Sequence, residues 1–176
     1  MGTKQSAGLH WSDVASVLAL VLSVAALFVA IIEANTTRDM AKAEAWPFLS
    51  VGPSYNSEGF SLLAVNKGVG PARIRDFVVS LRGKPVENLD QMILDVLGPE
   101  EAFSYDRYRS GLASSAVVSA GETLNIFWVD WDPASRKLSN VLQADLEISI
   151  CYCSVYDDCW QASMRRDEPE PVSRCP

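Results

Sequence analysis

Four cysteines are the residues of this chain whose type and spacing could carry chemistry. Cys151, Cys153, Cys159 and Cys175 all lie within the last 26 of its 176 residues. An even number of cysteines gathered beside a proline-rich tail favours structural disulfides formed in an oxidising compartment. Such bonds would tie the tail, residues 167–176, to the domain before it. Four cysteines allow three pairings, and their spacing does not choose among them.

Two other chemistries are open to the same cysteines. A zinc site of four thiolates is one, but the spacing C-x-C-x5-C-x15-C lacks the C-x2-C pairs of zinc ribbons, and the single histidine, His10, is far away in the sequence. Unpaired thiols in a cytosolic domain are the other. The disulfide hypothesis is preferred, and we expect neither a metal nor another cofactor.

The remaining polar residues form no catalytic constellation. A Ser/His/Asp triad fails because His10 precedes the apolar segment described below. Asp130 and Asp132, with Asp157 and Asp158, could supply oxygen ligands to calcium, but no loop glycine bends the chain around an ion. We interpret these aspartates as a strand end, a turn and a helix cap. No pair of carboxylates stands out as a glycosidase pair, so we expect a protein that is not an enzyme.

The element that positions the rest is an apolar run, Val14–Ile32, with no charge, proline or glycine. At about 1.5 Å per residue, a helix of this length crosses the roughly 30 Å hydrocarbon core of a bilayer. A signal peptide would have a shorter apolar stretch and a basic n-region, so an uncleaved anchor over residues 14–33 is favoured. Helical composition continues as a stalk over residues 34–45 and stops before Pro47. Residues 1–13 are then a short tail.

Small residues recur along the anchor at spacings of three and four. Beginning after Ser12, the stripe comprises Ser16, Ala19, Ser23, Ala26 and Ala30. Small side chains let helix backbones approach closely in lipid, and a 3.5-residue period favours left-handed packing. The stripe predicts a helix-packing face for a second copy or for another membrane protein.

The domain over residues 46–166 has the sequence pattern of a mainly β structure, in which glycine and proline turns separate short apolar segments. Strands are expected at Phe48–Val51, Phe60–Val65, Ala72–Leu81, Ser115–Val118, Thr123–Trp128, Leu146–Val155 and Cys159–Met164. About seven such strands suggest a β-sandwich of immunoglobulin-like type. Two short helical insertions are expected at Glu87–Leu97 and Pro133–Leu142, the second capped by Asp132.

The last two expected strands would form a hairpin around Tyr156-Asp157-Asp158. In that arrangement Cys153 and Cys159 lie near the turn on neighbouring strands. Cys151 is then left to hold the tail through Cys175.

Two short motifs carry a family resemblance. The first motif, Trp46-Pro47-Phe48-Leu49, opens the domain. The second is Asn66-Lys67-Gly68-Val69-Gly70-Pro71-Ala72, which predicts the end of one strand, a turn permitted by glycine, and a proline that fixes the backbone where the next strand begins. With the anchor and the Cys-Tyr-Cys…Cys-Trp hairpin, they resemble a group of uncharacterised bacterial single-pass membrane proteins with a small extracytoplasmic β domain. The resemblance implies a fold type and a bacterial envelope setting, and it implies no activity.

Charge and loop composition complete the functional hypothesis. A net charge of −7 without a basic stripe argues against nucleic acid and anionic lipid head groups as partners of the domain. A tyrosine–arginine mix in an expected loop is typical of contact surfaces; it comprises Tyr105, Arg107, Tyr108 and Arg109. We therefore expect a membrane-tethered, non-enzymatic interaction module. The alternative is a small-molecule or glycan sensor that signals through its anchor.

The location of the domain follows from the cysteines. Lysine and arginine are balanced on the two flanks of the anchor, so they decide nothing about its orientation. Disulfides require an oxidising side. We expect a bacterial inner-membrane protein with a cytoplasmic N-terminus and a periplasmic C-terminal domain.

Overall fold

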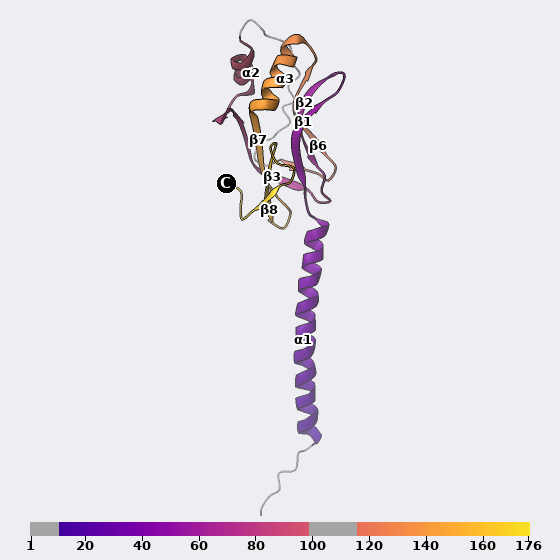
Figure 1. Ribbon diagram of the computed structural model, residues 1–176. Coiled ribbons are helices and arrows are strands. Elements are labelled where there is room, and N and C mark those ends of the chain that lie inside the picture. The colour runs from indigo at the N-terminus through magenta and orange to yellow at the C-terminus, as the bar shows by residue number, and fades with distance from the viewer. Residues whose placement is uncertain (1–10, 99–115) are drawn as a thin grey trace, which may run out of the picture. The chain divides into compact units, whose positions relative to one another are not determined.

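The computed structural model describes residues 11–98 and 116–176 (Figure 1). The chain divides into two compact units, Met1–Ala43 and Glu44–Pro176. Helix α1, Trp11–Glu44, is continuous over 34 residues, or about 51 Å at 1.5 Å per residue. None of its apolar span is buried, and its most apolar window has a mean hydropathy of 2.8. By length and composition, α1 is suited to cross a membrane.

The hydroxyl groups within the apolar span are satisfied by the helix itself. Ser16 Oγ donates to the carbonyl of Ser12 and Ser23 Oγ donates to the carbonyl of Ala19, each at 2.8 Å. In hydrocarbon an unpaired hydroxyl is costly. These bonds make the two serines compatible with a lipid environment.

The first sheet has three antiparallel strands in the order β1-β2-β6. They are β1 (Leu49–Tyr55), β2 (Gly59–Asn66) and β6 (Thr123–Asp130). The central strand, β2, is buried at most positions. The tight β1–β2 connection is held by Asn56, whose Oδ1 accepts the N–H groups of Glu58 and Gly59 at 2.8 and 2.9 Å.

The second sheet runs in the order β4-β3-β7-β8-β9, and a further short strand also pairs with β3. Its members are β3 (Ala72–Leu81), β4 (Lys84–Pro85), β5 (Val117–Val118), β7 (Leu146–Cys153), β8 (Cys159–Ser163) and β9 (Glu170–Val172). Every pairing in this sheet is antiparallel.

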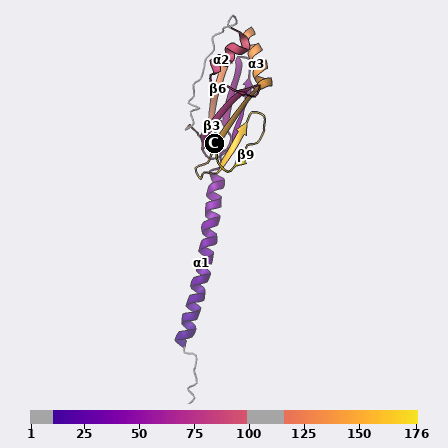
Figure 2. The same cartoon turned by 90° about the vertical axis from the view of Figure 1, so that its left-hand side faces the viewer.

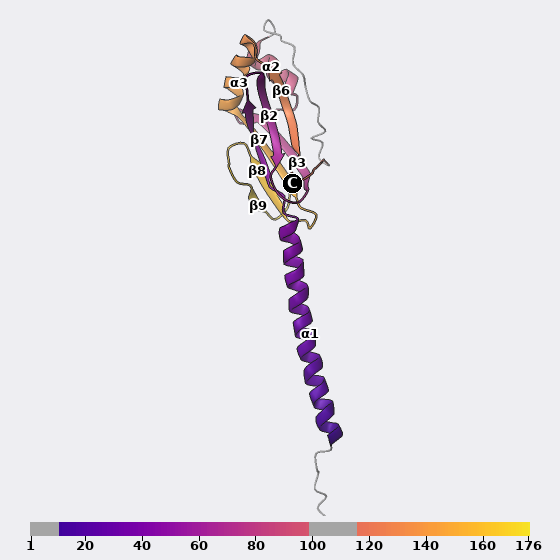
Figure 3. The same ribbon diagram turned by 90° about the vertical axis from the view of Figure 1, so that its right-hand side faces the viewer.

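Two short helices lie together at one end of the domain (Figures 2 and 3). Helix α2 (Leu89–Leu97) begins after the cap residue Asn88. Helix α3 (Pro133–Asp145) has a capping box in which Asp132 Oδ1 accepts Ser135 N–H at 2.6 Å and Ser135 Oγ accepts Asp132 N–H at 2.8 Å. The cap at Asp132 and the proline at the first turn of α3 agree with the sequence prediction.

One hydrophobic cluster draws side chains from both sheets and both short helices. Fully buried members include Phe60, Leu62 and Phe127 from the first sheet, Ile74, Ile148, Ile150 and Tyr152 from the second, and Leu138 and Leu142 from α3. Burial of this apolar surface is the main term that stabilises the domain.

The prediction of a mostly β domain behind one apolar helix is confirmed, and several bounds differ. β4 and β9 were not expected, because a two-residue strand and a proline-containing strand carry little pattern of their own. The proline-rich tail therefore contributes a strand to the sheet. β7 ends at Cys153 instead of Val155, since the N–H of Ser154 already bonds across the turn to the carbonyl of Asp158 at 2.8 Å.

Candidate functional site

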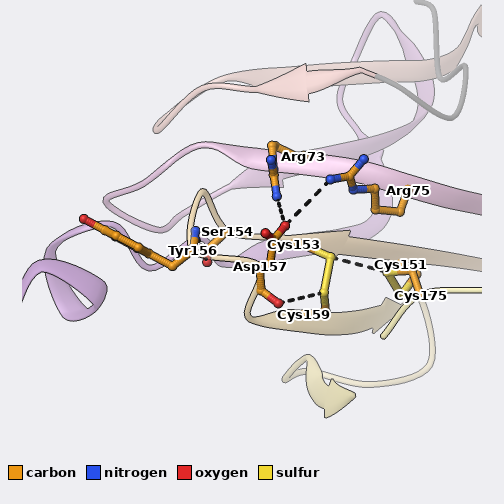
Figure 4. The surroundings of a disulfide bond; sticks show 9 residues. All are labelled: Arg73, Arg75, Cys151, Cys153, Ser154, Tyr156, Asp157, Cys159 and Cys175. Atoms are coloured by element: carbon orange, nitrogen blue, oxygen red, sulfur yellow. Dashed lines mark hydrogen bonds and ion pairs between the residues drawn. A yellow bond between two sulfur atoms is a disulfide. The ribbon is translucent and has the colours of Figure 1, made fainter. Parts of the chain in front are cut away.

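The four cysteines form two disulfides in adjoining positions (Figure 4). Cys153 and Cys159 are register partners on β7 and β8, and their bond closes the hairpin beside its turn. Cys151, two residues earlier on the same face of β7, is bonded to Cys175 in the tail. No cysteine of this chain is left free. These are the two bonds that the expected hairpin favours, with the Cys153–Cys159 loop lying inside the Cys151–Cys175 loop.

The turn that joins β7 to β8, residues 154–158, is tied to the neighbouring strand β3 by charge. Arg73 pairs with the carboxylate of Asp157, and Arg75 Nη2 lies 3.8 Å from the same carboxylate oxygen. Figure 4 shows both guanidinium groups converging on Asp157. Asp157 is mostly exposed in this pair, so the pair adds little stability by itself. The two arginines therefore contact the turn instead of pointing only into solvent.

Asn66, at the end of β2, is the polar hub of the loops at this end of the domain. Its side chain is fully buried. Oδ1 accepts the N–H groups of Phe48 and Gly68 at 3.1 and 3.0 Å. Nδ2 donates to the carbonyls of Gly70 and Val118 at 2.8 and 3.0 Å. All four hydrogen-bonding positions of the amide are used, so this side chain joins the entry segment, the following turn and β5.

The turn after Asn66, residues 67–71, packs directly on the backbone that enters the domain. The carbonyl of Trp46 accepts the N–H groups of Val69 and Gly70 at 3.0 and 3.1 Å. A Cβ on Gly68 would overlap the carbonyl of Trp46, and one on Gly70 would overlap Ala45. Neither glycine has a positive φ. The motif therefore needs glycine for close backbone approach and not, as its sequence suggested, for an unusual turn conformation.

Exposed apolar side chains gather on the loops at this same end. The strand register brings these segments to one end of the sheet. Arg73, near the start of β3, is paired with Val117 of β5 on one side and with Cys153, the last residue of β7, on the other. We define the entry surface as the five apolar residues there that are 43–66 % exposed, namely Trp46, Val69, Val117, Val155 and Tyr156. Tyr156 points away from the disulfides in Figure 4. Clustered exposed apolar groups mark interaction sites.

Sequence reasoning missed the entry surface, although one signal was present. Val69 is an apolar residue between two glycines in a turn, where a side chain has no strand or helix to bury it. The tyrosine–arginine strip predicted to contact a partner, residues 105–109, lies outside the described residues. The small residues predicted to form a helix-packing face lie on α1 and are exposed; they are Ser16, Ala19, Ser23, Ala26 and Ala30.

Two of the four aspartates considered for calcium have other roles in the structure. Asp132 caps α3, and Asp157 pairs with Arg73. Over residues 11–98 and 116–176, the one group of metal-ligating side chains that converges consists of cysteines, and these are disulfide-bonded.

A polar hollow of about 410 Å³ lies over β7, β8 and β9. Its side chains bond mainly to one another. Ser163 Oγ donates to Glu147 Oε1 at 2.6 Å, and Gln161 Nε2 donates to Ser149 Oγ at 2.7 Å. Because these groups already satisfy each other, the hollow gives no support to a buried ligand site.

Comparison with protein-family models, with curated proteins and with solved structures found no match to this chain.

Proposed function

We propose that this chain is a single-pass protein of the bacterial inner membrane that carries a non-enzymatic interaction module in the periplasm. Its domain is taken as a β-sandwich of immunoglobulin-like type that binds another envelope protein or supports a membrane assembly. The observation that carries the proposal is the entry surface: five exposed apolar residues on strand β5 and on loops that Asn66 and the Cys153–Cys159 bond hold in place.

Two features of the entry surface favour binding. Removal of exposed apolar area from water favours association with a partner. Loops that are already ordered lose little conformational entropy when a partner docks. Here the turn containing Val69 is held by backbone hydrogen bonds to Trp46, and the turn containing Tyr156 is closed by the Cys153–Cys159 bond. A rigid apolar surface of this kind suits a protein partner better than a small molecule.

The binding test is affinity purification of the full chain from mild detergent. The variant Val69→Ser/Tyr156→Ser removes apolar area from the entry surface. Its control, Val78→Ser/Tyr55→Ser, also removes one exposed valine and one exposed tyrosine, from positions outside the entry surface. We expect the first variant to lose the co-purifying protein and the control to retain it. Equal recovery of the partner by both variants would refute the role of the entry surface.

The location is tested separately. Membranes washed with high salt should retain the protein, because α1 has an apolar span long enough to cross the bilayer. Protease added to spheroplasts should digest the domain, and gels with and without reductant should show the disulfides. Protection of the domain from protease, together with thiols that react only after lysis, would place it in the cytosol instead.

The small-residue face of α1 is proposed to pack against a second copy or another membrane helix. Changing Ala19 and Ala26 to isoleucine would add bulk to this face, whereas Val21→Leu changes the opposite side of the helix. Cross-linking in native membranes should weaken for the first change and persist for the second. The same pattern of cross-links in both would remove the packing hypothesis.

A further inference from the structure

The two disulfides are in contact with each other. Cys153 Sγ lies 3.8 Å from Cys175 Sγ, although these atoms belong to different bonds. The sulfur atoms of Cys153, Cys159 and Cys175 all lie within 4.8 Å of one another. Thiol–disulfide exchange needs a thiolate next to a disulfide sulfur, and this cluster already supplies that proximity.

The two bonds differ in how easily a reductant can reach them. Cys151, Cys153 and Cys159 are buried, whereas Cys175 is part-exposed and lies beyond β9, outside any strand. A dithiol in solution therefore meets the sulfur of Cys175 first. The hairpin bond between Cys153 and Cys159 is shielded from direct attack.

We propose that the two disulfides form an exchange pair, in which opening of the Cys151–Cys175 bond lets Cys175 take over Cys153 from Cys159. A dithiol oxidoreductase first reduces the Cys151–Cys175 bond to two thiols and is itself oxidised to a disulfide. The Cys175 side chain, no longer bonded to Cys151, then turns into line with the Cys153–Cys159 bond, and its thiolate attacks Cys153 Sγ. The Cys153–Cys175 bond forms, the Cys153–Cys159 bond breaks, and Cys159 leaves as a thiolate that takes up a proton.

The surroundings suit this transfer. The sulfur of Cys159 lies 3.3 Å from the carbonyl oxygen of Asp157, which can accept a hydrogen bond from the released thiol. Arg73 and Arg75 converge on the carboxylate of Asp157 in the turn beside the hairpin disulfide.

The competing attack, by Cys151 on Cys153, is disfavoured by strand geometry. Residues two apart on a strand are separated by about 6.6 Å, near the upper limit of about 6.8 Å for the Cα atoms of a disulfide. Cys175 comes from the tail and is not bound by this spacing. The exchange therefore has one preferred attacking group.

The test uses two variants of the full chain in detergent, each with a single thiol. Cys151→Ser leaves Cys175 free, and Cys175→Ser leaves Cys151 free. Each protein is incubated at pH 8 without reductant, quenched with acid, alkylated and analysed by peptide mass spectrometry. We expect Cys151→Ser to give peptides joined through Cys153 and Cys175 together with alkylated Cys159. Cys175→Ser should show only the Cys153–Cys159 bond.

Three further observations make the result decisive. The exchanged fraction should not change with protein concentration, since the transfer is within one chain. Its rate should fall about tenfold for each pH unit in the acid range, because the thiolate is the nucleophile.

A second variant covers the case in which Cys151→Ser does not fold. Cys159→Ser leaves Cys153 as the free thiol, and its attack on Cys175 should form the Cys153–Cys175 bond and free Cys151. Alkylation of the original thiol alone, or equal exchange in Cys175→Ser, overturns the proposal.

Discussion

The phenolic oxygen of Tyr152 accepts a hydrogen bond from the backbone N–H of Leu49 at 3.2 Å, which joins β7 of one sheet to β1 of the other. Tyr152 is fully buried and its ring stacks on Trp160. Burial raises the pKa of this hydroxyl to about 12, and the bond from Leu49 offsets only part of the effect. Burial therefore favours the neutral form of the tyrosine that joins the two sheets.

The stability of the domain should therefore fall in alkali. Below pH 10 the hydroxyl of Tyr152 is protonated in both the folded and the unfolded chain. Between about pH 10, the usual pKa of tyrosine, and about 12, the unfolded chain ionises while the folded chain does not, so unfolding becomes easier. The urea midpoint of Tyr152→Phe should drop less than that of the wild type from pH 8 to pH 11.5. Tyr156→Phe, at an exposed site, should behave as the wild type.

Removal of the Asn66 side chain should destabilise the domain strongly. Asn66→Ala removes the hydrogen bonds to two part-buried N–H groups and two buried carbonyls, and a buried polar group that loses its partner costs about 1–3 kcal/mol before relaxation. We expect a loss of about 3 kcal/mol in the free energy of unfolding by urea. Asn56→Ala, which removes an exposed turn cap, should cost about 1 kcal/mol. Equal losses would contradict the hub role.

The entry glycines should tolerate no side chain. Gly70→Ala would drive a Cβ into the backbone at Ala45, which has no flexible side chain to move aside. We expect a loss of about 2 kcal/mol, as for other overpacked sites. Gly52→Ala in β1 meets nothing within 4 Å and should leave the free energy of unfolding by urea within about 0.5 kcal/mol of the wild type. A neutral Gly70→Ala would show that the turn can move away.

The two disulfides should differ in their contributions to stability. The bond from Cys151 to Cys175 closes a loop with a sequence separation of 24, and that from Cys153 to Cys159 a loop with a separation of 6. The chain-entropy relation gives about 3.5 and about 2.4 kcal/mol. Paired serine variants should lower the free energy of unfolding in that order. A larger loss from the hairpin bond would mean that strand geometry outweighs loop entropy.

Sequence reasoning succeeded where a local pattern determined the element. The uninterrupted apolar composition of α1 predicts a long helix, and Asp132 followed by Pro133 predicts the start of α3. β3 has the bounds expected from its apolar residues between glycine breaks. In each case neighbouring residues alone are sufficient to specify the structure.

It failed where contacts distant in sequence decide. β9 holds Pro171 and depends on pairing with β8 and on the bond from Cys175 to Cys151. The need for Gly70 comes from Ala45, 25 positions earlier in the chain. The entry surface is assembled from four separate segments, namely the entry segment, the turn at Val69, β5 and the turn at Tyr156, so no single stretch of sequence displays it.

The tail strand has a consequence for solubility. β9 covers β8 and ends the described sheet with Glu170 and with Pro171, which has no N–H to offer. A charged, proline-bearing border resists the addition of strands from other molecules. If the cross-link from Cys175 to Cys151 were lost, β8 could present its unpaired backbone and Trp160 instead. The oxidation of one terminal cysteine would then guard the protein against aggregation.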